Sequence, residues 1–328
     1  MAFNIAKRIL VGARESVAGT AETLVNADFD VRARAVEFTP DIQGGDEDSK
    51  FATGDYGEDI AISGVRGGST TNETKLASAS AIDSAPKYGK FFEACGLVGE
   101  SFAGTGYGFQ PLSSGDKQTL TLNKIDISDD GTSVGIKSAM AGVMGNMTIG
   151  AEGVGAPIKV AYEWKGKFSG LTDLPNGSIP TLTAPDTTIG AKLMNGVATI
   201  WGQDLCIQSF SLNLGNTIEY LLCPSDETGI LTSTITNRQP RMTLTLIAPP
   251  KSTFDPFAEV TGEGEDSILL TFGDWSLIVP RGQILSYSET DLNGRLGYEL
   301  NIKLNRNSGA DANLEDESTF QILQGAIA

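Results

Sequence analysis

The stretch from Gly155 to Lys165 reads GAPIKVAYEWK, and the stretch from Gly297 to Arg306 reads GYELNIKLNR. In both stretches, apolar side chains alternate with mostly polar or charged side chains. Successive side chains of a β-strand point to opposite faces of its sheet, so this period predicts strands with one apolar and one polar face. The two stretches therefore indicate a β-rich chain in which one strand pattern recurs.

The order of the predicted elements also recurs. In the first half, an alternating run at 31–39 and an apolar run at 59–65 precede a short helix and further strands. In the second half, runs at 206–214 and 241–247 precede a helical turn at Asp255–Ala258 and further strands. The recurrence predicts two units of related fold.

The length of the chain agrees with two units. Its 328 residues are enough for about two domains, each long enough to bury a core of its own. Three prolines and the Asn176-Gly177 pair lie between residues 169 and 191, which places the predicted boundary there. We therefore expect a mainly β fold of tandem β-sandwich or barrel-like units, residues 1–170 and 171–328, each with one short flanking α-helix.

The clearest helix of the first half is predicted at 86–97. Ser84 is a suitable N-cap, and Pro86 fits the first turn, where its missing N–H costs nothing. Gly96 can end the helix in a left-handed conformation. One face of this helix is aromatic and apolar, and its residues are Tyr88, Phe91, Phe92 and Cys95. This face predicts packing against a sheet.

Loops and terminal arms complete the predicted organisation. The acid- and glycine-rich stretch 41–57 is long for a loop in a compact domain, so it forms either an insertion or the tip of a long hairpin. Residues 66–80 are rich in Gly, Ser, Thr and Ala and are predicted to be flexible. Residues 2–27 are interpreted as an extended or loosely strand-like arm, and 305–328 as a C-terminal arm that docks on a neighbour.

Composition excludes several kinds of catalysis. The chain has no histidine, which excludes serine–histidine and cysteine–histidine catalysis and removes the commonest transition-metal ligand. Its three cysteines form no CxxC pair, and we expect buried, reduced side chains. We assign no catalytic, cofactor-binding or metal-binding residues and expect no enzyme.

Motif searches agree with that assignment. The glycine-rich stretches 64–68 and 104–108 match neither a phosphate loop nor a dinucleotide-binding turn, and we interpret both as loops. Two acidic clusters could bind calcium at the surface, although neither matches the twelve-residue calcium loop. Their residues are Asp126, Asp129, Asp130, Glu263, Glu265 and Asp266. A hydrolase that uses two carboxylates stays open as an alternative, because spacing alone does not rule it out.

Charge and hydropathy limit the partners. The formal charge is −17, which argues against a surface that grips nucleic acid, because such a surface needs clustered Lys and Arg. It is compatible with a surface that nucleic acid passes without binding. The apolar runs are far shorter than the roughly 20 residues that cross a bilayer. We therefore expect no membrane-spanning segment and a soluble product made in the cytoplasm.

Three patches of sequence match the pattern of a known family. The first joins VGARE at Val11–Glu15 to AGTA at Ala18–Ala21. The second is APKYGKFFEACGL at Ala85–Leu97, and the third is IQSFSLNLGN at Ile207–Asn216. These patches, which lie in both halves of the chain and cover a small part of it, resemble the major tail tube proteins of long-tailed, siphovirus-like bacteriophages.

This resemblance implies a structural virion protein. In the family, small β-sandwich or barrel-like units with one flanking helix close into six-unit rings, and stacked rings form a tube through which DNA leaves the capsid. With two units per chain, three chains would make a ring of pseudo-sixfold symmetry, whereas a single elaborated unit would require six. Such a ring pairs sheet edges that would otherwise promote aggregation.

The resemblance also implies partners and a location. Other tail proteins would bind at the tube ends, and genomic DNA would pass without sequence-specific binding, repelled by an acidic lumen over a Debye length of about 8–10 Å. The protein would reside in the virion tail after synthesis in the cytoplasm of the bacterial host. The alternative is a tail-tip, decoration or glycan-binding β-sandwich module of a virion.

Overall fold

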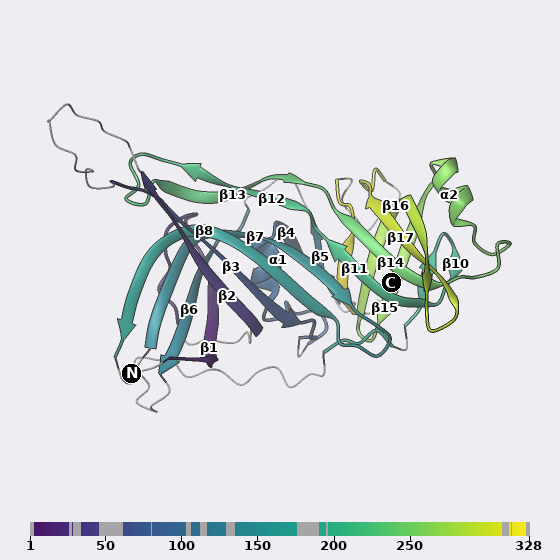
Figure 1. The fold of residues 1–328 in the computed structure, drawn as a ribbon, viewed down its shortest axis with the longest axis horizontal. Helices are drawn as coiled ribbons and strands as arrows, with labels where there is room; N and C mark the ends of the chain where they lie inside the picture. Colours follow the sequence, from purple (N-terminus) through teal and green to yellow (C-terminus); the bar gives the residue numbers. More distant parts are fainter. Residues whose placement is uncertain are drawn as a thin grey trace, which may run out of the picture.

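The computed structural model describes residues 3–25, 28, 34–45, 62–79, 81–102, 106–111, 117–128, 135–175, 190–194, 196–309, 315 and 317–325. The fold is mainly β, with 62% strand and 6% helix, and most strands belong to one large antiparallel sheet. Figure 1 shows an elongated molecule with strands of the first half at one end and strands of the second half at the other. The predicted mainly β class is confirmed.

The described residues form eighteen strands and two short helices. The strands of the first half are β1 (Phe3–Arg14), β2 (Arg34–Gly45), β3 (Ile62–Lys75), β4 (Leu97–Phe102), β5 (Gly106–Pro111), β6 (Leu120–Ser128), β7 (Gly135–Ala151) and β8 (Lys159–Leu174). Those of the second half are β9 (Ala198–Ile200), β10 (Gln203–Asp204), β11 (Ile207–Asn213), β12 (Asn216–Leu222), β13 (Ile230–Arg238), β14 (Arg241–Ile247), β15 (Glu265–Phe272), β16 (Trp275–Asp291), β17 (Leu296–Leu304) and β18 (Gln321–Gly325). The helices are α1 (Gly89–Ala94) and α2 (Pro256–Gly262).

The strands of the two halves follow the same spatial order. In the first half, the neighbouring strands are β2, β3, β8, β7, β6 and β1. In the second half, they are β11, β14, β17, β16, β15 and β9. Each half also places its helix after the second strand of this order, with α1 after β3 and α2 after β14.

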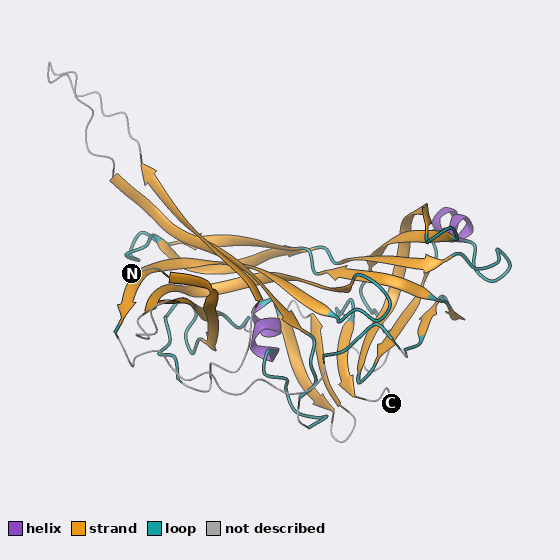
Figure 2. Cartoon of the chain, turned by 60° about the horizontal axis from the view of Figure 1, so that its bottom comes forward, coloured by secondary structure: helices purple, strands orange, loops and turns teal. Residues whose placement is uncertain are grey.

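Three contacts join the two halves. The end of β7, residues 148–151, pairs with residues 210–213 of β11. β18 pairs with both β16 and β5, so it bridges the halves. The third contact is the β12–β13 hairpin, which follows β11 and lies over strands of the first half, as Figure 2 shows.

One apolar core runs through both halves. α1 packs against the sheet of the first half, where the Phe91 ring lies 5.5 Å from the rings of both Tyr162 and Trp164. Tyr88, beside α1, lies 6.4 Å from the ring of Trp275 in the second half. Phe91 is completely buried, and its cluster continues through β11, β14, β16 and β17. The predicted packing of the aromatic helix face against a sheet is confirmed.

The helix ends differ from the prediction at one end of α1. The helix starts at Gly89 with Tyr88 as N-cap and no capping side chain, so the predicted start at Ser84–Pro86 is wrong. The Pro86 carbonyl instead accepts a hydrogen bond from the Gly89 N–H in a turn. Gly96 ends the helix with φ +78°, as predicted. In α2, the Asp255 side chain caps the N-terminus and Pro256 occupies the first turn.

Several predicted loops and arms are strands. Residues 41–45 belong to β2 and residues 66–75 to β3, and the two strands pair in one long hairpin. Residues 46–57, the rest of the predicted insertion, lie outside the described part of the chain. The glycines at 64–68 are in β3, and those at 106 and 108 are in β5. The N-terminal arm is β1 in the sheet, and β18 pairs within its own chain, so the prediction of a free C-terminal arm is wrong for 321–325.

Candidate functional site

The outer face of the joined sheet is polar from one half to the other. One row of exposed or half-buried residues crosses seven strands, from β3 to β16: Lys75, Lys159, Gly150, Ser211, Thr243, Asn301 and Ser286. The adjacent row points inward and is buried: Thr74, Val160, Ile149, Leu212, Met242, Ile302 and Ile284. The alternation therefore continues without a break across the β7–β11 junction.

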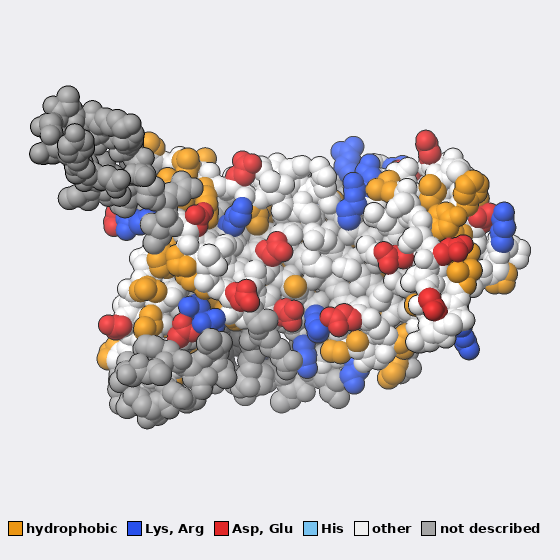
Figure 3. All heavy atoms as spheres, in the orientation of Figure 1, with side chains coloured by type: hydrophobic (Ala, Val, Ile, Leu, Met, Phe, Trp, Pro, Cys, Tyr) orange, Lys and Arg blue, Asp and Glu red, His pale blue; other side chains and the backbone are white. Residues whose placement is uncertain are grey.

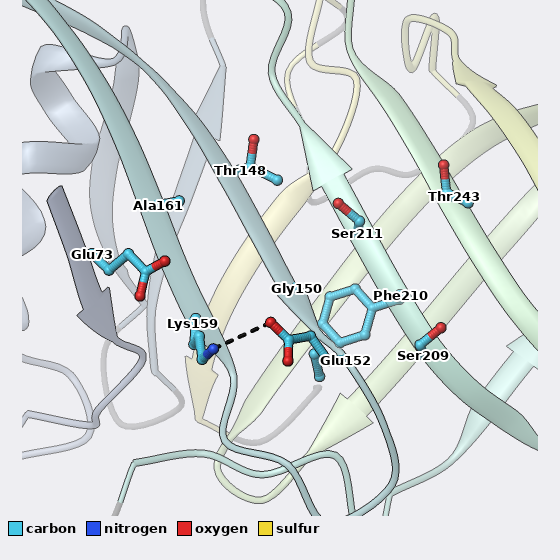
Figure 4. A pocket seen from close by; sticks show the side chains of 11 residues that line it. Glu73, Thr148, Gly150, Glu152, Lys159, Ala161, Ser209, Phe210, Ser211 and Thr243 are labelled. Carbon is cyan, nitrogen blue, oxygen red and sulfur yellow. Dashed lines mark hydrogen bonds and ion pairs between the residues drawn. The ribbon is translucent and has the colours of Figure 1, made fainter. Parts of the chain in front are cut away.

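A hollow of about 380 Å³ lies on this face at the junction. Its lining is mostly small or polar, and Lys159 forms an ion pair with Glu152 at 3.2 Å within it (Figure 4). The remaining charged residue is Glu73, and the aromatic ring beside the hollow belongs to Phe210. The lining supplies hydrogen-bonding groups of both charges, and it contains neither histidine nor cysteine to act as base or nucleophile.

Charges are mixed over the neighbouring surface. In the view of Figure 3, acidic and basic side chains are scattered among uncharged ones, and neither sign covers the visible face. The described residues include no group of three or more His, Cys, Asp or Glu side chains that could hold a metal ion.

The β12–β13 hairpin covers part of the outer face in the first half. Lys165 of β8 donates a hydrogen bond to the Ile218 carbonyl at 3.4 Å, and Lys167 pairs with Asp226 at 2.9 Å. Hydrogen bonds from the hydroxyl and the backbone N–H of Thr228 hold the pKa of Asp226 at about 2, below its ordinary value, and Lys167 adds to the effect. The hairpin is thus held by specific polar contacts.

Apolar contacts lie between the hairpin and the sheet. β7 has a bulge after Ala141, and the Met144 side chain in this bulge packs against Ile218 and Ile235 of the hairpin. These three side chains form a small cluster separate from the main core. At the hairpin base, Arg238 donates to the Gly96 carbonyl at 2.8 Å and so contacts the C-terminal end of α1.

A buried carboxylate holds the chain next to the hairpin. Glu15 is only 6% exposed, and its two oxygens accept four hydrogen bonds. The donors are the backbone N–H groups of Gly19 and Gly142 and the hydroxyls of Thr119 and Thr121, at 2.6–2.9 Å. Glu15 therefore ties the turn after β1 to β6 and β7, and this carboxylate belongs to the fold.

Two of the open strand edges among the described residues correspond to the edges that join the halves. β2 pairs with β3 on one side and has no ladder partner on the other. In β16, residues 284–291 pair with β17 alone, because the ladder to β15 ends at Gln283. The corresponding edges at the centre of the molecule, β11 and residues 148–151 of β7, are paired with one another.

The residues singled out from the sequence do not form a common site. Asp126 pairs with Arg8 and Lys124, Glu265 pairs with Arg281, and Asp129 and Asp130 lie outside the described residues. Cys95 is buried as expected, and burial raises the pKa of its thiol. Cys206 is exposed, so that expectation is wrong for this residue, and Cys223 is half-buried. All three are free.

Sequence reasoning missed the main features of this surface. The β7–β11 junction and the place of the β12–β13 hairpin depend on pairing between distant segments, for which the local period carries no signal.

No protein-family model matches the chain, and no curated protein matches it. Within the described residues, no helix combines the length and apolar character needed to cross a membrane.

Proposed function

We propose that the chain consists of two tandem units of one fold, residues 1–170 and 171–328. The support is the common strand order of the two halves, in which β2, β3, β8, β7, β6 and β1 correspond to β11, β14, β17, β16, β15 and β9. The equivalent position of α1 and α2 agrees with the proposal. Each unit would be a barrel-like sandwich with one short helix.

The pairing of β7 with β11 is the observation that carries the functional proposal. It is a contact between two successive units, and the same pair of edges is open at the two ends of the chain, on β2 and on residues 287–291 of β16. We propose that β2 of one copy pairs with this part of β16 in the next. Because the contact is head-to-tail, repetition closes a ring if the rotation allows it.

We infer from this geometry and from the resemblance to tail tube proteins that the chain is a structural subunit of a bacteriophage tail tube. Three chains would close a ring of six units, and stacked rings would form the conduit for DNA, with other tail proteins at the ends. The polar face mixes carboxylates and amines, so repulsion of DNA would depend on the whole charge of −17.

Electron microscopy of the purified protein tests this proposal. We expect rings or tubes, and native mass measurement of an isolated ring should give three chains. Six chains per ring would contradict the tandem-unit arrangement and leave the tube function in place. A protein that stays monomeric at high concentration would contradict both.

A further inference from the structure

The outer face of the first unit is covered at the bulge of β7. β7 leaves its ladder with β6 at Val143, and Met144 follows immediately on the outer face. Met144 is 2% exposed because Ile218 and Ile235 of the β12–β13 hairpin lie over it. The hairpin reaches this place by continuing from β11, which pairs with β7 a few residues further along.

The corresponding bulge of β16 is uncovered. β16 leaves its ladder with β15 at Gln283, and a bulge follows between Ile284 and Ser286. Ile284 and Tyr287 pack with the core, so Leu285 between them lies on the outer face, where it is 42% exposed. Leu285 is thus a large apolar side chain within the bulge, next to Ser286, which like Met144 is the first residue to pair after its bulge, and no hairpin lies over Leu285 among the described residues.

The first unit possesses a hairpin that matches this surface. Gly67 is the last residue of β3 that pairs with β8, and beyond it β2 and β3 continue to pair only with each other. We call residues 42–45 and 62–66 the β2–β3 arm. In the chain, this arm lies where β2 leads into β3, just as the β12–β13 hairpin lies where β11 leads into β14. Figure 2 shows it projecting away from the sheet of its own unit.

We propose that the surface around Leu285 is the docking site for the β2–β3 arm of a second copy. This inference rests on the proposed head-to-tail association, since pairing of β2 with residues 287–291 of β16 brings the arm over the bulge. The β11 strand and its hairpin show the same geometry within one chain. The second copy is the occupant because its arm is the segment with the matching place in the repeat.

A lysine lies beside the proposed docking site, as one does beside the bulge of β7. Lys167, beside the bulge of β7, pairs with Asp226 of the hairpin. Lys303 holds the corresponding place beside the bulge of β16, since it pairs with Gln283 in the last outward-facing row before Leu285. The arm begins beside the exposed Asp41. We therefore expect an amine–carboxylate contact next to the apolar one.

A Leu285→Asp variant tests the docking site. We expect it to fold, with unchanged circular dichroism, and to need about tenfold or more protein than the wild type to form rings. The matched control is Leu296→Asp. Leu296 is 50% exposed in the same half, and it shares a face of β17 with Tyr298, which packs against the core, so it lies on the opposite face of the sheet from Leu285. Ring formation can be followed by light scattering and negative-stain microscopy.

A photo-crosslinker placed at position 285 identifies the occupant. In a mixture of isotopically labelled and unlabelled chains, we expect mixed-label crosslinks to peptides from 34–45 or 62–75. Crosslinks to other segments, or normal rings from Leu285→Asp, would overturn the docking site while leaving self-association intact. A wild type that forms no rings would overturn the proposed function and the docking site together.

Discussion

Replacing Phe91 by alanine should weaken both halves of the molecule at once. Phe91 lies in α1 of the first half, is completely buried, and packs edge-on against Tyr162 and Trp164. A cavity left by Phe→Ala in a core costs about 3–5 kcal/mol of unfolding free energy. The aromatic contacts place the expected loss in the upper part of this range. Because the core cluster is continuous, the loss should apply to one cooperative transition of the whole chain.

Single-tryptophan variants make this prediction measurable. Trp164 reports on the first half and Trp275 on the second, and both are buried. Urea unfolding is followed by fluorescence at a concentration low enough to keep the chain unassembled, because association would add to the apparent stability. We expect the two probes to give the same midpoint, and Phe91→Ala to shift both equally. Phe257→Ala, at a site 58% exposed, should change the free energy by less than about 0.5 kcal/mol.

A split result would refute the reasoning. If Phe91→Ala lowered the midpoint reported by Trp164 and left that of Trp275 unchanged, the halves would unfold independently. The shared sheet and core would then contribute little coupling between them.

Three further predictions concern polar groups. Glu15→Ala should cost about 2–4 kcal/mol in urea unfolding because four buried donors lose their acceptor, and an unchanged midpoint would contradict this. The pKa of Asp226 is lowered to about 2 in the folded chain, so this carboxylate stabilises the fold above its unfolded pKa, and the stabilisation is lost as the pH falls toward 2. In Asp226→Asn, the free energy of unfolding should therefore depend less on pH in the acid range. An unchanged pH dependence would refute this role of Asp226. With a thiol reagent at neutral pH, Cys223 should react first and Cys206 second, because a hydrogen bond with Ser225 lowers the pKa of Cys223. Peptide mass spectrometry measures the order of modification. Modification of the buried Cys95 in the folded chain would contradict the structure.

Strands with a regular apolar period were predictable from the sequence. The run at 241–247 is β14, and the alternating stretch that starts at Gly297 lies in β17 up to Leu304. In these strands the inner row is apolar and the outer row polar, so the local pattern reports the burial. The helix α2 was predictable for a similar reason, because Asp255 and Pro256 provide the start signal.

Residues 66–75 of β3 were predicted to be flexible because the inner row of this strand is polar. Thr70, Asn72 and Thr74 are buried, and each makes a hydrogen bond, while Asn72 Nδ2 has no hydrogen-bond partner among the described residues. Asn72 accepts from Trp164 at 2.6 Å, Thr74 contacts the Tyr162 hydroxyl at 3.3 Å, and Thr70 donates to the Glu37 carbonyl. A row of threonine and asparagine has the composition of a loop, and its partners are far away in the sequence.

The assembly surface was less predictable than the strands. An open edge and a covered bulge depend on which distant strand lies alongside, and β18 is an example, since its partners β5 and β16 come from different halves. The expectation of a docking C-terminal arm followed from an apolar segment at the end of the chain. The segment does dock, on its own chain.

The pairing of β7 with β11 has a kinetic consequence. Because both strands belong to one polypeptide, their encounter depends on the chain that connects them and is independent of protein concentration. In the proposed ring of three chains, half of the unit-to-unit junctions would form during folding of the monomer. Two encounters between chains, followed by closure of the ring, would then replace the five encounters that six separate units would need, so ring formation would have a lower kinetic order and a shorter lag at low concentration.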